Sequence, residues 1–151
     1  MMDDHFAVQT ESLTKDYGDG TSVRALEDVS FSIAQAEFVA IEGPSGSGKS
    51  TLLNLIGTLD NPTSGRVVID GVDIGALEVD ALADFRREKI GFVFQLFNLA
   101  PTLDALENVM LPALIAGFSK SKAIQLSQEA LHQVGLSERV SHRPQELSGG
   151  E

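Results

Sequence analysis

The sequence predicts an α/β fold in which strands dominate the first half of the chain and helices the second. Apolar residues alternate with small or polar residues over positions 29–34, and a short apolar run at 38–41 leads directly into a glycine-rich loop. After residue 100, apolar residues recur every three or four positions, as they do on one face of a helix. We therefore expect a core over residues 1–99 and a helical subdomain over residues 100–151.

Five stretches of the first half are expected to be strands. They are an N-terminal stretch with Phe6, Val8 and Leu13, and residues 29–34, 38–41, 66–69 and 90–95. The alternation at 29–34 is typical of a half-buried strand, whereas the uniformly apolar run at 38–41 indicates a strand buried on both faces. Asp70 and Gly71 are expected to form a tight turn, because glycine adopts a positive φ at little cost.

Two helices are expected in the second half. Their apolar positions are Leu103, Leu106, Met110 and Leu114 in the first, and Ala123, Ile124, Ala130, Leu131 and Val134 in the second. Thr102 is a candidate N-cap for the first helix, and Gly135 is the expected stop of the second.

Composition excludes several classes of function. Eleven basic against 22 acidic residues give a formal net charge of −11, which argues against a nucleic-acid partner. The chain has no cysteine, so it contains no disulfide and fits a reducing compartment. The most apolar later stretch, 109–118, is interrupted by Pro112 and Gly117 and is shorter than a membrane span. We expect a cytoplasmic protein that contacts a membrane only through a partner.

The clearest chemical motif is the glycine-rich loop after the run at 38–41. It consists of Gly43, Pro44, Ser45, Gly46, Ser47, Gly48, Lys49, Ser50 and Thr51, which matches the P-loop pattern G-x-x-x-x-G-K-[ST]. The backbone N–H groups of such a loop approach phosphate oxygens, and the helix expected over 49–56 adds the positive end of its dipole. Lys49 is expected to contact the β- and γ-phosphates of ATP, and Ser50 to bind Mg²⁺.

A second motif narrows the class. Leu147, Ser148, Gly149 and Gly150 read LSGG, and together with the P-loop the chain resembles the ABC-type ATPases over essentially its whole length. The resemblance implies that Tyr17 stacks on adenine, Gln95 contacts Mg²⁺ and the attacking water, and Ser148, Gly149 and Gly150 bind the γ-phosphate held by a second subunit. Since a π-face suffices for stacking, Tyr17→Phe is expected to bind ATP nearly normally.

The resemblance also implies partners and a place in the cell. The chain resembles the lipoprotein-releasing and macrolide-exporting class of ABC ATPases, and also a cell-division ATPase, in four segments: residues 43–54, 61–65, 92–95 and 107–109. It implies a homodimer on the inner face of the cell membrane, which couples ATP binding and hydrolysis to export or release of a substrate through a transmembrane permease. The family's Walker B strand, catalytic Glu and switch His would follow the signature, so residues 1–151 alone are expected to be inactive. The alternative is a truncated, non-hydrolytic remnant.

Overall fold

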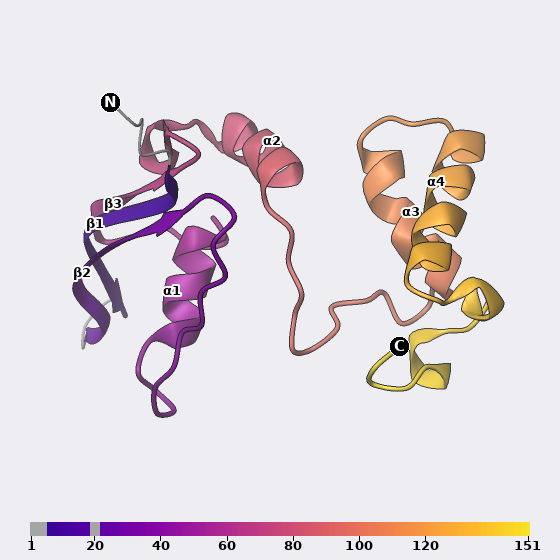
Figure 1. The fold of residues 1–151 in the computed structure, drawn as a ribbon, viewed down its shortest axis with the longest axis horizontal. Helices are drawn as coiled ribbons and strands as arrows, with labels where there is room; N and C mark the ends of the chain where they lie inside the picture. The colour runs from indigo at the N-terminus through magenta and orange to yellow at the C-terminus, as the bar shows by residue number, and fades with distance from the viewer. Residues whose placement is uncertain (1–5, 19–21) are drawn as a thin grey trace. The chain divides into compact units, whose positions relative to one another are not determined.

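The computed structural model describes residues 6–18 and 22–151, which form two compact units. The first unit is Met1–Phe92 and the second is Val93–Glu151. Figure 1 shows the sheet and helices α1 and α2 in the first unit, and helices α3 and α4 in the second.

An antiparallel sheet forms the framework of the first unit. Its strands are β1 (Phe6–Tyr17), β2 (Val23–Ala34), β3 (Ser64–Ile69) and β4 (Val72–Asp73), in the order β2-β1-β3-β4. The predicted alternation in β2 is confirmed, because Val29, Phe31 and Ile33 are half-buried while the residues between them are exposed. The predicted turn between β3 and β4 is also confirmed, with φ of 51° at Asp70 and 78° at Gly71.

Helix α1 (Lys49–Ile56) packs on this sheet, as predicted for residues 49–56 (Figure 1). Its buried side chains, Leu52 and Leu55, join a core that also contains Leu13, Leu26, Val67, Ile69 and Ile74. A 3₁₀ turn (Ile74–Ala76) and helix α2 (Val79–Lys89) follow the sheet. Arg86 of α2 donates a hydrogen bond of 2.9 Å to the carbonyl of Thr58, just past the C-terminus of α1, where a cation is favourable.

Two predicted strands do not form. Residues 38–41 and 90–95 are not in strands, and the side chains of Phe38 and Val93 are fully exposed. The prediction was wrong because apolar character indicates burial but does not supply a partner, and a strand needs a neighbour to pair its backbone N–H and C=O groups. Within residues 6–18 and 22–151, the sheet ends at β2 and β4, and neither segment extends it.

The second unit is helical, as predicted. Its main elements are α3 (Ala105–Ile115) and α4 (Lys120–Gln133), which pack on one another. Two 3₁₀ turns follow, Ser137–Arg139 and Pro144–Glu146. Gly135 ends α4 as predicted: its φ is 76° and its N–H donates to the carbonyl of His132.

Two details of the helix prediction were wrong. The N-cap of α3 is Asp104 and not Thr102, because the Asp104 carboxylate accepts from the Glu107 N–H at 2.8 Å while Glu107 accepts from the Asp104 N–H. Ala130 of α4 and Val134, its C-cap, are exposed, and the buried face of α4 consists of Ala123, Ser127 and Leu131.

Candidate nucleotide-binding site

The predicted P-loop is folded as a loop that leads into α1, and two of its glycines are required by its shape. Gly46 and Gly48 have φ of 81° and 87°, which residues with a Cβ rarely adopt. A Cβ on Gly48 would also lie 2.5 Å from the carbonyl oxygen of Ala25 in β2. The glycine at position 48 therefore sets how closely the start of α1 approaches the sheet.

The N-terminus of α1 is open to a ligand. Gly48 is the N-cap and provides no side-chain acceptor, and the first turn contains no acidic residue. The helix begins with the Leu52 N–H donating to the Gly48 carbonyl at 2.8 Å, so the amides of Lys49, Ser50 and Thr51 have no acceptor within the helix. These groups and the helix dipole favour an anion at this position.

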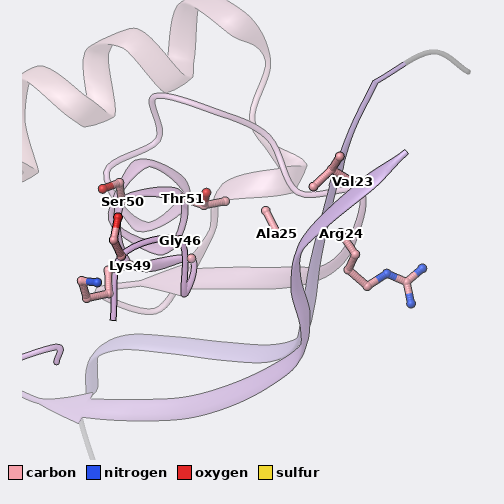
Figure 2. Close-up of a pocket in the computed structure, with 9 residues that line it drawn as sticks. Val23, Arg24, Ala25, Gly46, Lys49, Ser50 and Thr51 are labelled. Carbon is pink, nitrogen blue, oxygen red and sulfur yellow. The ribbon is translucent and has the colours of Figure 1, made fainter. Parts of the chain in front are cut away.

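A pocket of about 290 Å³ lies between this helix start and strand β2 (Figure 2). The residues that line it are Val23, Arg24 and Ala25 of β2, and Ser45, Gly46, Gly48, Lys49, Ser50 and Thr51. In Figure 2, the side chains of Val23 and Ala25 lie on the side of the pocket opposite Ser50, while the guanidinium of Arg24 points away from the P-loop. The pocket thus has a polar wall of loop and helix and a largely apolar wall of β2.

Lys49 and Arg24 are the cations of the pocket lining, and they differ in their partners. Lys49 Nζ donates to the carbonyls of Gly43 and Pro44 at 2.9 and 2.7 Å, so its ammonium lies against the P-loop. Arg24 is paired with Asp16 at 2.9 Å and Glu27 at 2.7 Å. These two carboxylates, Asp16 foremost, raise the pKa of Arg24 above its usual range. Arg24 is therefore already paired with carboxylates of β1 and β2. Of the two cations, Lys49 is the one that we expect to bind a phosphate.

Tyr17 lies beside the pocket. It is the last residue of β1 and pairs with Val23, the first residue of β2 and a lining residue of the pocket. Its hydroxyl donates a hydrogen bond of 2.8 Å to Asp60, in the loop after α1, and the residue is 40% exposed. The side chain itself is not part of the pocket lining.

The other predicted site residues belong to the second unit. Gln95 is exposed in a segment without helix or strand. Ser148, Gly149 and Gly150 form a turn in which the Glu151 N–H donates to the Ser148 carbonyl at 3.0 Å. The structure brings residues 43–51 together with β2 in one unit, and describes Gln95 and the signature residues in the other.

Glu151 organises the signature turn, a role that the prediction missed. Its carboxylate accepts from the Ser148 N–H at 2.9 Å and from Arg139 Nε at 3.0 Å. The Ser148 N–H and Arg139 lower the pKa of Glu151 to about 2. The spacing S-x-x-E at 148–151 is a sequence signal for this arrangement, since it is the pattern of a capping box.

The prediction also missed the β2 wall and Asp60. Val23 and Ala25 belong to no sequence motif, so their role in the pocket lining becomes visible only from the position of β2 in the structure. Asp60 is 43 residues from the tyrosine that it binds. No local pattern connects two such positions.

The chain can be compared with known proteins. The profile of the ABC transporter family matches residues 26–151. The lipoprotein-releasing system ATP-binding protein LolD of Geobacter metallireducens is 50% identical over 145 residues, which cover 95% of this chain and 64% of that protein. The macrolide export ATP-binding/permease protein MacB of Hyphomonas neptunium is 49% identical over 145 residues, which are 95% of this chain and 22% of that protein.

Solved structures agree in fold. The ATP-binding cassette MJ0796, in a dimeric post-hydrolysis state bound to ADP and phosphate, matches with a TM-score of 0.84 and 46% identity. The match covers 94% of this chain and 63% of that one. A second dimeric structure of MJ0796 gives a TM-score of 0.84 at 45% identity. The predicted ABC ATPase fold is therefore confirmed, and the chain belongs to the ABC transporter family.

Proposed function

We propose that this chain is the nucleotide-binding part of an ABC transporter ATPase, which couples ATP binding and hydrolysis to movement of a substrate through a permease. The observation that carries the proposal is the pocket at the start of α1, where open amides, Lys49 and the apolar wall of β2 face one space. A nucleoside triphosphate has the matching chemistry, because it joins an anionic chain of phosphates to an apolar, planar base.

The P-loop residues bind the phosphates in this proposal. The amides of residues 46–51 donate to phosphate oxygens, and Lys49 exchanges the carbonyls of Gly43 and Pro44 for the β- and γ-phosphates. Ser50 lines the pocket with a hydroxyl, an oxygen ligand of the kind that Mg²⁺ prefers. Ser50 would hold the Mg²⁺, which would supply positive charge to offset the charge that develops on the phosphate oxygens.

Tyr17 and β2 bind the base. Tyr17 lies opposite Val23 in the sheet. If the phosphates bind at the start of α1 and the nucleotide extends along β2, its base reaches the Tyr17 ring. A stacked ring interacts with the face of a base and not with its hydrogen-bonding edge. We therefore expect weak discrimination among purine triphosphates.

The second unit supplies the coupling residues. Gln95 would bind Mg²⁺ through its amide oxygen, would orient the attacking water and would respond to the permease, since an amide accepts through oxygen and donates through nitrogen. Ser148, Gly149 and Gly150 bind the γ-phosphate held by a second copy of the subunit. The dimeric MJ0796 structures, which are similar to this chain, support such a homodimer.

Hydrolysis requires more than this pocket. Among the residues that the structure describes, those that line the pocket include no carboxylate that could polarise water, and general-base assistance typically contributes about 10²–10⁴ in rate. We infer that residues 1–151 by themselves bind ATP but release phosphate slowly. Steady-state phosphate release from the 151-residue chain tests this inference, and turnover at the rate of a homologous full-length ATPase would refute it.

The names of the relatives support a proposal for the cargo, and the family supports one for the location. LolD and MacB are named for lipoprotein release and macrolide export, so we propose a lipoprotein or a macrolide-like compound as the transported substrate. Among the described residues, no helix is long and apolar enough to cross a bilayer. We propose that the chain reaches the inner face of the cell membrane by binding its permease.

The phosphate site is tested by Lys49→Ala, with Lys120→Ala as matched control. Each lysine is the first residue of its helix, α1 or α4, but only Lys49 lines the pocket. We expect Lys49→Ala to weaken Mg-ATP binding by about 10- to 150-fold, since a hydrogen bond to a charged group contributes about 1.5–3 kcal/mol. Lys120→Ala is expected to bind normally. Equal affinities in the two variants would refute the assignment of the phosphate site.

A further inference from the structure

The hydroxyl of Tyr17 belongs to a polar cluster that lies outside the phosphate pocket. The cluster consists of Lys15, Tyr17, Asp60 and Asn61. Asp60 Oδ2 accepts from the Tyr17 hydroxyl at 2.8 Å, and Asp60 Oδ1 accepts from Lys15 Nζ at 2.7 Å and from the Asn61 N–H at 2.8 Å. Both carboxylate oxygens are therefore occupied, and the cluster joins the end of β1 to the loop after α1.

Lys15 is held more firmly than an ordinary surface lysine. Its side chain is only 12% exposed, and its ammonium also donates to the Asn61 carbonyl at 2.6 Å. Lys15, and secondarily Tyr17, lower the pKa of Asp60 from its usual value against the opposing effect of burial. Asp60 therefore remains ionised at neutral pH, as an acceptor for both partners.

The cluster also covers one face of the Tyr17 ring. Lys15 Nζ lies over the ring, 4.8 Å from its centroid, which is cation–π geometry. One face is thus covered by the ammonium, while the residue as a whole is 40% exposed. A base that stacks on Tyr17 would therefore use the opposite face.

We propose that Asp60 and Lys15 are positioning residues for Tyr17, which hold its ring in one orientation for stacking on the base of the bound nucleotide. The proposal rests on the proposed function of Tyr17. Asp60 follows α1, whose other end carries the P-loop, so the hydrogen bond sets the ring relative to the helix that binds the phosphates. A ring already ordered before binding loses less conformational freedom on stacking.

The test compares a ligand that has a base with one that has none. Binding of Mg-ATP and of Mg-tripolyphosphate is measured by calorimetry for the unmodified protein and for Tyr17→Phe, Asp60→Ala, Lys15→Ala and Tyr17→Ala. Asp60→Ala and Tyr17→Phe each remove the hydrogen bond, and the second does so without disturbing Lys15. Glu11→Ala is the matched control, because Glu11 is also on β1 and pairs with Arg66 at 2.8 Å outside the cluster.

We expect Asp60→Ala, Lys15→Ala and Tyr17→Phe to weaken Mg-ATP binding by about 2- to 12-fold, the range for ordering one side chain at an interface. Mg-tripolyphosphate binding is expected to stay within a factor of about two, because that ligand does not reach the ring. In a Tyr17→Ala background, Asp60→Ala should have no further effect on Mg-ATP, since the two residues act through one contact. Glu11→Ala should bind both ligands normally.

Different results overturn different claims. If Tyr17→Ala weakens Mg-ATP binding but neither Asp60→Ala nor Tyr17→Phe does, the positioning role is wrong and the stacking role stands. If Asp60→Ala weakens the binding of Mg-ATP and of Mg-tripolyphosphate equally, Asp60 is a structural residue and the proposal is wrong. If Tyr17→Ala leaves Mg-ATP binding unchanged, the stacking role fails, and the positioning role fails with it.

Discussion

Replacement of Gly48 by alanine isolates the contact between the P-loop and the sheet. In the left-handed conformation of Gly48, φ 87°, a Cβ would lie 2.5 Å from the Ala25 carbonyl oxygen and 2.7 Å from Leu26 Cδ2. The left-handed conformation costs about 1–2 kcal/mol and overpacking about 1–3 kcal/mol, so we expect Gly48→Ala to lower the free energy of unfolding by about 2–5 kcal/mol.

Gly46→Ala is the matched control for the conformational part of this cost. Gly46 has nearly the same φ, 81°, but a Cβ there meets no atom within 4 Å. We expect Gly46→Ala to lower the free energy of unfolding by only about 1–2 kcal/mol. The assay is urea unfolding followed by tyrosine fluorescence, which reports on the first unit because Tyr17 is the chain's one tyrosine and there is no tryptophan. Equal destabilisation by the two substitutions would refute the argument that β2 fixes the start of α1.

Three further predictions concern the second unit. Because the pKa of Glu151 is lowered to about 2, its stabilisation of the signature turn is complete above its usual pKa of 4.5 and is lost as pH falls toward 2. An NMR titration of the Glu151 carboxyl should show this, and Arg139→Ala should move the midpoint upward; an unchanged midpoint would contradict the pairing. Asp104→Ala should lower the free energy of unfolding by about 0.5–2 kcal/mol and speed hydrogen exchange at the Glu107 amide. Unchanged exchange would argue against the capping box. Gln95→Ala should lower permease-stimulated phosphate release more than basal ATP binding, and equal losses would make Gln95 an ordinary nucleotide contact.

The features that the sequence predicted correctly are those encoded by neighbouring residues. The loop before α1 could be predicted because glycines at 46 and 48 permit positive φ at the positions where the loop requires it. The alternation in β2 and the stop at Gly135 likewise depend on a few adjacent side chains. In each case the residue type determines the backbone conformation directly.

The errors and omissions arise where distant residues decide the structure. Residues 38–41 are apolar enough for a buried strand, but pairing depends on a neighbour that no local pattern specifies. The wrong N-cap is an error of another kind: Asp104 and Glu107 are three residues apart and form the local pattern of a capping box, which distinguishes Asp104 from Thr102. The hydrogen bond between the Tyr17 hydroxyl and Asp60 joins positions 43 residues apart, so the prediction that Tyr17→Phe binds ATP nearly normally could not include it.

The central claim, that the start of α1 binds the phosphates of Mg-ATP, is tested most directly by NMR of the backbone amides. On addition of Mg-ATP, and equally of Mg-tripolyphosphate, at a concentration near its Kd for the unmodified protein, we expect the largest shifts at the amides of residues 46–51. We expect Lys49→Ala to reduce these shifts strongly at the same ligand concentration. Shifts confined to other residues, or unchanged shifts in Lys49→Ala, would contradict the account.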